Sequence, residues 1–114
     1  MKYRPEILIV AGAGRNVGKS TLVCRLIEKF NALQPTAVKV SPHFHQAIAS
    51  DLKYILSEEK KPGTTKDSSR FLKAGARRVY FIQAHDDHLM HAFGELSNYL
   101  PAKTPLIVES GGLA

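Results

Sequence analysis

Residues 7–21, with the sequence ILIVAGAGRNVGKST, decide the fold of this chain. The stretch begins with an apolar run at residues 7–10 that is too short for a helix and rich in branched side chains, so it predicts a buried strand. A glycine-rich segment follows, and beyond it apolar residues recur at helical spacing from Leu22 to Phe30. The stretch therefore predicts a strand, a glycine-rich turn and a helix in immediate succession.

The glycine-rich turn ends in Gly18-Lys19-Ser20 and is close to the phosphate-binding P-loop pattern GxxxxGK[ST], with Ala13 at the first glycine position. Glycines and small residues let successive N–H groups point at an anion, and the helix N-terminus adds the positive end of its dipole. We expect Lys19 to reach the phosphates and the Ser20 hydroxyl to bind Mg²⁺. A turn with a chance Gly-Lys-Ser is the alternative, and the strand–turn–helix context favours the P-loop. The predicted nucleotide-binding residues are Gly14, Arg15, Asn16, Val17, Gly18, Lys19, Ser20 and Thr21.

Short apolar strands alternate with helical patterns along the rest of the chain. Besides the first strand, strands are expected at residues 36–40, 78–82 and 105–108. Helices are expected at residues 18–33, 48–56 and 66–75, and from Asp86 to Leu100; residues 58–65 are expected to form an exposed loop. This alternation predicts an α/β fold, a mainly parallel sheet with helices on both faces, as in a short P-loop NTPase. Ligands of such sheets bind beyond the carboxyl ends of the strands.

Length and composition predict a single nucleotide-binding domain over residues 1–114. The net charge of +6, from 16 Lys and Arg against 10 Asp and Glu, suits a polyanionic ligand such as a nucleotide. Nucleic acid is not the expected partner, because the basic residues are scattered. No apolar run approaches the roughly twenty residues of a membrane span, and no signal peptide is evident. The single cysteine, Cys24, favours a reducing cytoplasm.

Several segments of this chain resemble the molybdopterin-guanine dinucleotide biosynthesis protein B (MobB) family of P-loop GTP-binding proteins. They are AGRNVGKSTL at residues 13–22, VKVSPHFH at 38–45, PGTTKDSSRFLKAGARRV at 62–79 and LIVESGG at 106–112. The third is the most specific. The chain departs from the family at the Lys-His after the second strand, which is Lys39-Val40-Ser41 here, and at the Glu-Gly of the last strand, which is Glu109-Ser110. The resemblance implies GTP as ligand, Mg²⁺, weak GTPase activity and a protein partner in molybdenum cofactor synthesis.

Acidic residues complete the predicted site. Glu109 follows an apolar strand, the usual position of a carboxylate that holds Mg²⁺ through water or polarises the attacking water; a capping or surface role is the alternative. Asp67 is a second metal candidate, and either Asp67 or a nearby Thr is the expected N-cap of its helix. Arg70, three residues on, either pairs with Asp67 or contacts phosphate. The predicted catalytic residues are Lys19 and Glu109, and the predicted metal ligands are Ser20, Glu109 and Asp67.

Other interpretations remain open at the level of sequence. The segments NVGKST and VESGGL also look like those of a dethiobiotin-synthetase-like ATP-dependent ligase, so ATP is an alternative to GTP. A nucleotide-binding adaptor without turnover is a third possibility. A Ras-like GTPase is disfavoured because the DxxG and NKxD segments are missing. His85, His88 and His91 favour a solvated helix face over a zinc site. The exposed edge of a short parallel sheet favours a homodimer.

Overall fold

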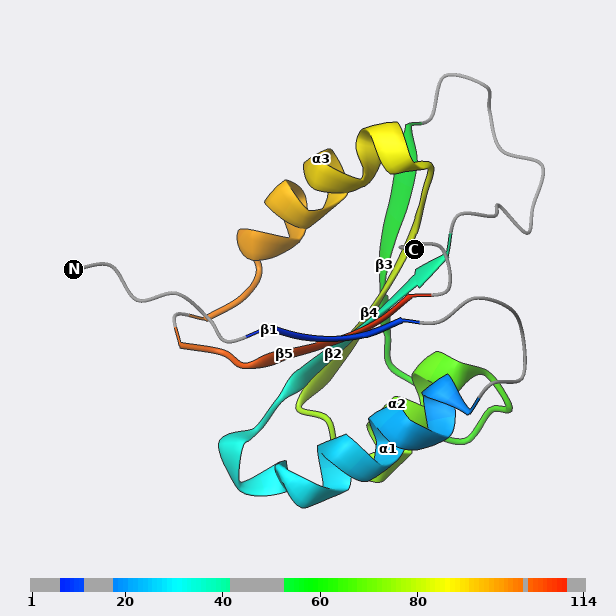
Figure 1. Cartoon of the computed structure of the whole chain (residues 1–114), viewed down its shortest axis with the longest axis vertical. Helices are drawn as coiled ribbons and strands as arrows, with labels where there is room; N and C mark the ends of the chain where they lie inside the picture. The colour runs from blue at the N-terminus through cyan, green and yellow to red at the C-terminus, as the bar shows by residue number, and fades with distance from the viewer. Residues whose placement is uncertain (1–6, 12–17, 42–52, 102, 111–114) are drawn as a thin grey trace.

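The computed structural model describes residues 7–11, 18–41, 53–101 and 103–110. Within them, a five-stranded sheet has the strand order β1-β5-β2-β4-β3 (Figure 1). The strands are β1 (Ile7–Ala11), β2 (Thr36–Ser41), β3 (Tyr54–Glu59), β4 (Arg78–Ala84) and β5 (Leu106–Ser110). The helices are α1 (Lys19–Lys29), α2 (Asp67–Ala74) and α3 (Asp86–Ser97), with a 3-10 turn at Asn31–Leu33. The expected α/β fold is confirmed.

Most of the sheet is parallel. β1 pairs with β5, β5 with β2, and β2 with β4, all in parallel, whereas β3 runs antiparallel to β4 at one edge. Connections between neighbouring parallel strands need crossovers, and here these include helices. The parallel arrangement brings the carboxyl ends of β1, β5 and β2 to the same edge of the sheet.

The helices cover both faces of the sheet, as the alternating pattern predicts (Figure 1). α1 and α2 lie on one face and α3 on the other. Successive strand residues point to opposite faces of the sheet. In β2, Ala37 therefore packs in the core under α1 and α2, whereas Val38 and Val40 pack in the core under α3. Phe71 of α2 is fully buried in the first core, and Leu96 of α3 in the second.

The strand β3 corrects the expectation of a helix at residues 48–56 and a loop at 58–65. Residues 48–52 lie outside the described part of the chain, and residues 54–59 form a strand that pairs with β4 along its whole length. Tyr54 and Leu56 pack on the α3 side of the core, while Ser57 and Glu58 are exposed. An apolar run this short fits helix and strand equally well, and the exposed edge of β4 decides between them.

The ends of two helices differ from their expected positions. α1 ends at Lys29 rather than near Leu33, because the chain passes into a 3-10 turn and then Gln34 adopts a left-handed conformation with φ of 55°. Gly75 ends α2 with φ of 112°, as expected for a C-terminal glycine. The prediction that Asp67 caps α2 is wrong: Lys66 is the N-cap residue, without a side-chain cap, and Asp67 is the first helical residue.

None of the helices in the described residues combines the length and the apolar character that crossing a membrane requires.

Candidate functional site

The candidate site lies where β1, β5 and β2 run side by side. Val10 of β1 is in register with Glu109 of β5, and Glu109 is in register with Lys39 of β2. These neighbours stand near the carboxyl ends of their strands. β1 therefore ends beside the end of β5, and residues 12–17 of the glycine-rich segment lie outside the described part of the chain.

Glu109 is a buried carboxylate on the α1 and α2 side of the sheet. It lies two residues after Ile107, which packs in the core under these helices, so both side chains point to the same face. Its side chain is 1% exposed, and its Oε2 accepts a hydrogen bond from the Nζ of Lys39 at 2.6 Å. A buried carboxylate is costly unless a positive group and hydrogen bonds compensate its charge. Lys39 supplies this compensation.

Asp67 connects the two helices to the sheet. Its Oδ2 accepts a hydrogen bond from the Nζ of Lys39 at 3.1 Å, and its carboxylate also accepts one from the hydroxyl of Ser20 at the start of α1. Arg70, one turn further along α2, pairs with Oδ1 of Asp67 at 3.5 Å. The expected pairing of Arg70 with Asp67 is thereby confirmed. Two of the predicted metal ligands, Asp67 and Glu109, thus share the ammonium of Lys39, and the third, Ser20, contacts Asp67.

The surroundings shift the pKa values of both partners in one ion pair. Burial raises the pKa of Asp67, but the hydrogen bonds from Ser20 and Lys39 and the positive charges of Lys39 and Arg70 outweigh burial and lower it. Burial lowers the pKa of Lys39, but the hydrogen bonds and charges of Glu109 and Asp67 outweigh it, so the pKa of Lys39 is raised. The ion pair of Lys39 and Asp67 is therefore charged at neutral pH.

The start of α1 has features that favour an anion. Gly18 is its N-cap residue, in a left-handed conformation with φ of 79°, and the first turn contains no acidic residue and no side-chain cap. Lys19 is the first residue of the helix. Thr21 is exposed and its Oγ1 accepts a hydrogen bond from Nη2 of Arg70 at 3.4 Å. The remaining predicted binding residues, Gly14, Arg15, Asn16 and Val17, lie outside the described residues.

The donors at this edge fit a hard divalent cation that also binds phosphate. Ser20, Asp67 and Glu109 offer only oxygen ligands, and Mg²⁺ is usually held by one or two carboxylates together with phosphate oxygens and water. Within the described residues, no group of at least three His, Cys, Asp or Glu side chains is able to hold a metal ion.

Lys39 is the functional candidate that sequence reasoning missed. Its segment is TAVKVS, and Thr36, Ala37, Val38, Val40 and Ser41 are all buried. A lysine within an otherwise buried strand needs a negative partner, because lysine is almost never buried unpaired. That signal is visible in the sequence, but the identity of the partners is not, since Asp67 and Glu109 are 28 and 70 residues away.

The histidines of α3 lie on the opposite face of the sheet from this site. The rings of His88 and His91 stack with centroids 6.3 Å apart, and Nδ1 of His88 is buried without a hydrogen-bond partner. His85 and His91 are exposed. The remaining two histidines of the sequence, His43 and His45, lie outside the described residues.

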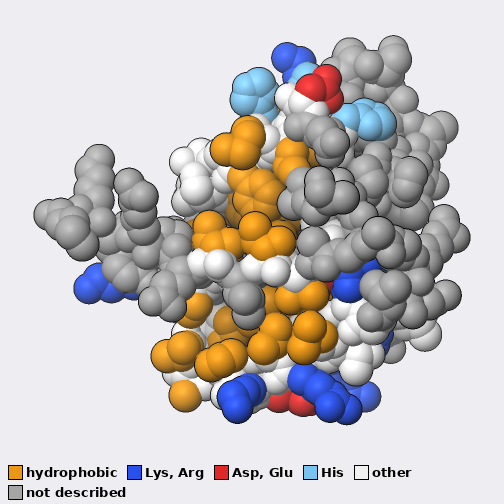
Figure 2. All heavy atoms as spheres, viewed as in Figure 1, with side chains coloured by type: hydrophobic (Ala, Val, Ile, Leu, Met, Phe, Trp, Pro, Cys, Tyr) orange, Lys and Arg blue, Asp and Glu red, His pale blue; other side chains and the backbone are white. Residues whose placement is uncertain are grey.

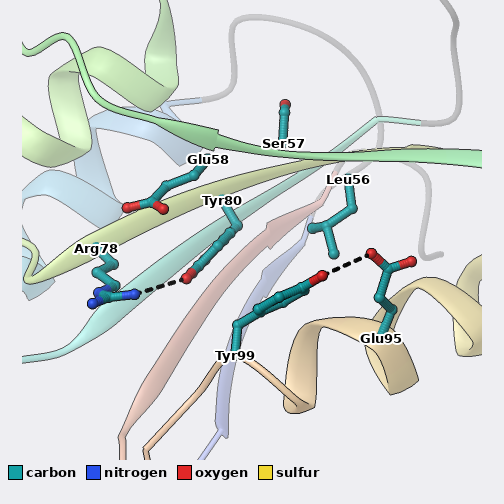
Figure 3. Close-up of a pocket in the computed structure, with 7 residues that line it drawn as sticks. All are labelled: Leu56, Ser57, Glu58, Arg78, Tyr80, Glu95 and Tyr99. Carbon is teal, nitrogen blue, oxygen red and sulfur yellow. Dashed lines mark hydrogen bonds between the residues drawn. The ribbon is translucent and has the colours of Figure 1, made fainter.

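A small open pocket of about 210 Å³ lies away from the candidate site, between α3 and the strands β3 and β4 (Figure 3). Arg78 and Tyr80, near the amino end of β4, contribute to it, and Tyr99 donates a hydrogen bond to Glu95. The pocket thus lies toward the amino end of β4, whereas parallel sheets bind ligands at the carboxyl ends. Its lining residues are Leu56, Ser57, Glu58, Arg78, Tyr80, Glu95 and Tyr99.

Comparison of the chain with protein-family models, with curated proteins and with solved structures gave no significant match.

Proposed function

We propose that this chain is a Mg²⁺-dependent GTP-binding protein with a P-loop NTPase fold and weak GTPase activity, similar to the MobB family and accessory to molybdenum cofactor synthesis. One observation carries the proposal. The carboxylates of Asp67 and Glu109 meet at one position, the ammonium of Lys39, near the carboxyl ends of parallel strands, and the hydroxyl of Ser20 contacts Asp67. This position adjoins a helix that begins with Gly18-Lys19-Ser20 after a glycine-rich segment.

In this proposal the nucleotide phosphates bind at the N-terminus of α1. The helix dipole and the N–H groups of the glycine-rich turn attract the phosphates, and Lys19 contacts their oxygens. Ser20, with Asp67 and Glu109, holds Mg²⁺, which neutralises charge on the phosphates. The resemblance of the segment KDSSRFLKAGA, at residues 66–76, favours GTP over ATP.

Slow turnover follows from the surroundings of the proposed catalytic carboxylate. Phosphoryl transfer to water requires a group that positions the water in line with the leaving oxygen, and Glu109 has this role here. Glu109 is almost completely buried, and in this proposal it also binds Mg²⁺. A buried carboxylate that holds the metal ion is poorly placed to position a water molecule as well. Hydrolysis by the isolated chain is therefore slow, and a protein partner is the user of the bound nucleotide.

The proposed assembly is a homodimer. Among the described strands, β1 pairs only with β5, which leaves its other edge open. Its side chains Ile7 and Ile9 are 56% and 55% exposed, and Figure 2 shows hydrophobic side chains gathered on the face viewed. An open, uncharged edge strand is a template for pairing with another chain. A second copy, related by a two-fold axis, presents the same edge.

Calorimetric titration with GTP and with ATP, each with and without Mg²⁺, tests the proposal. We expect GTP to bind more tightly than ATP and Mg²⁺ to strengthen binding. Ser20→Ala should remove most of the Mg²⁺ dependence, and equal losses with and without Mg²⁺ would contradict the role of Ser20. Tighter binding of ATP would instead favour a dethiobiotin-synthetase-like ligase. GTP binding without hydrolysis would favour an adaptor, and no nucleotide binding would refute the proposal.

A further inference from the structure

Lys39 places a positive charge at the centre of the proposed metal site. Its Nζ lies 2.6 Å from Oε2 of Glu109 and 3.1 Å from Oδ2 of Asp67. Both carboxylates are also proposed Mg²⁺ ligands, so the ammonium and the metal ion would use the same oxygen atoms. They cannot both do so at full strength, because two cations on the same oxygens repel each other.

We propose that Lys39 is a tethered counter-cation, which holds the carboxylates of Asp67 and Glu109 when no nucleotide is bound and competes there with a divalent cation. The inference rests on the metal site of the proposed function and adds a regulatory residue to it. Metal binding with a nucleotide then requires the ammonium of Lys39 to leave the two carboxylates. The triphosphate, which is itself an anion, is the new partner of the displaced ammonium.

The burial of the three side chains suits such an exchange. Glu109 is 1% exposed on a central strand and is fixed, whereas the side chain of Lys39 is 24% exposed and that of Asp67 is 36% exposed. Lysine carries its charge on a flexible four-carbon chain, so its ammonium is able to move while the backbone of β2 stays in place. The carboxylates therefore remain positioned as the ammonium leaves.

The exchange predicts positive coupling between metal and nucleotide. Without nucleotide, Lys39 already compensates the charge of Glu109, and the carboxylates attract a divalent cation only weakly. With nucleotide, the phosphates draw the ammonium away and add their own oxygen ligands. Each ligand then strengthens the binding of the other by the same factor, as linkage requires.

The test is Mn²⁺ binding in the absence of nucleotide, followed by electron paramagnetic resonance of free Mn²⁺. Lys39→Met and Lys39→Gln should bind Mn²⁺ at least about tenfold more tightly than the wild type, because a competing positive charge is removed from a partly buried site. Lys39→Arg keeps the charge and should bind like the wild type. Lys73→Met is the matched control, since Lys73 is an exposed lysine in the last turn of α2.

A second substitution identifies the site of the new binding. Adding Glu109→Gln to Lys39→Met should abolish the gain, and retention of the gain would contradict the inference. Circular dichroism establishes that each variant is folded. The wild type supplies an independent test that needs no variant: Mn²⁺ alone should leave its Tm unchanged, and Mn²⁺ with GTP should raise it.

The outcomes separate this inference from the proposed function. Equal Mn²⁺ affinity of folded Lys39→Met, Lys39→Gln and wild-type protein would overturn the inference even if GTP binds. A rise in the Tm of the wild type with Mn²⁺ alone would also overturn it. A gain in Mn²⁺ affinity that Glu109→Gln removes would support the competition even if the calorimetric titration shows no nucleotide binding, and only the proposed function would then fail.

Discussion

Lys39 and Glu109 are register partners on the neighbouring parallel strands β2 and β5, and Nζ of Lys39 lies 2.6 Å from Oε2 of Glu109. The side chain of Glu109 in this pair is buried, with an exposed fraction of 1%. Removing one partner of such a pair leaves an uncompensated charge, so the two residues depend on each other for stability. The stability of each variant at this pair must therefore be measured together with its nucleotide binding and hydrolysis.

Replacement of Glu109 by Gln should slow GTP hydrolysis roughly tenfold to a hundredfold, because the group that positions and deprotonates water is lost. Binding of GTP should change much less, since Lys19 and the helix N-terminus supply most of the phosphate contacts. Single-turnover hydrolysis and calorimetry measure the two effects separately. A variant with the wild-type hydrolysis rate would show that Glu109 is not catalytic.

Replacement of Lys19 by Ala should weaken GTP binding by roughly 2–4 kcal/mol, as expected when charge-assisted hydrogen bonds to phosphate are removed. Lys29→Ala is the matched control, because Lys29 is an exposed lysine in the last turn of the same helix. Its dissociation constant should stay close to that of the wild type. An unchanged affinity in Lys19→Ala would exclude the assigned phosphate contact.

Replacement of Ile9 by Lys should shift the proposed homodimer toward the monomer, because a charge on an edge strand opposes pairing with another strand. Sedimentation equilibrium measures the change. Met90→Lys is the control, since Met90 is 79% exposed on α3, which packs mainly against β3 and β4, toward the edge of the sheet opposite β1. A wild-type chain that is monomeric at high concentration would rule out the dimer.

Replacement of Gly75 by Ala should destabilise the protein by about 1–2 kcal/mol, because Gly75 has a left-handed backbone that disfavours a side chain. Its φ is 112°, and an added Cβ would lie 2.5 Å from Nδ2 of Asn31. Gly94→Ala should do the opposite and stabilise α3 by about 0.5–1 kcal/mol. Gly94 is an exposed helical residue with no atom within 4 Å of an added Cβ. Chemical denaturation of both variants tests this contrast.

Replacement of Glu59 by Gln should change how stability depends on pH in the acid range. The hydroxyl of Ser68 donates a hydrogen bond to Oε1 of Glu59 at 2.7 Å and lowers the pKa of this carboxyl from its ordinary value of 4.5. The ionised carboxylate therefore stabilises the fold above pH 4.5, and this contribution is lost as the pH falls below 4.5 through the lower folded pKa. The difference in unfolding free energy between wild type and Glu59→Gln should shrink over that range; a constant difference would contradict the prediction.

Much of the architecture follows from local patterns in the chain. The strand before the glycine-rich segment, the helix after Gly18, the helix that ends at Gly75 and the last strand were all predicted and are confirmed as elements. Two details differ: Ile7 and Ile9 of the first strand are exposed rather than buried, and the last strand includes Glu109 instead of ending before it. Each of these elements depends on hydrophobic periodicity or on the conformational freedom of glycine, and both are properties of neighbouring residues. The P-loop interpretation and the choice of GTP remain predictions.

β3 is a strand that local sequence patterns do not predict. The run Tyr-Ile-Leu followed by Ser-Glu-Glu at residues 54–59 fits a helix end and a loop as well as it fits a strand. Pairing with β4 makes this segment a strand, and its partners in β4 lie twenty or more positions further along the chain. Propensity over so short a segment is too weak to make that choice.

The amino-acid sequence by itself determined the alternation of strands and helices, and it placed Ser20, Asp67 and Glu109 as polar residues next to those elements. Only the tertiary structure decided that Asp67 and Glu109 flank Lys39 and that Ser20 contacts Asp67, because strand order and register are set by packing between distant segments. The alternation arises from interactions between near neighbours. The ion pairs of Lys39 form because a partly buried charge needs oppositely charged partners. Those partners are the residues that the completed fold brings close to it.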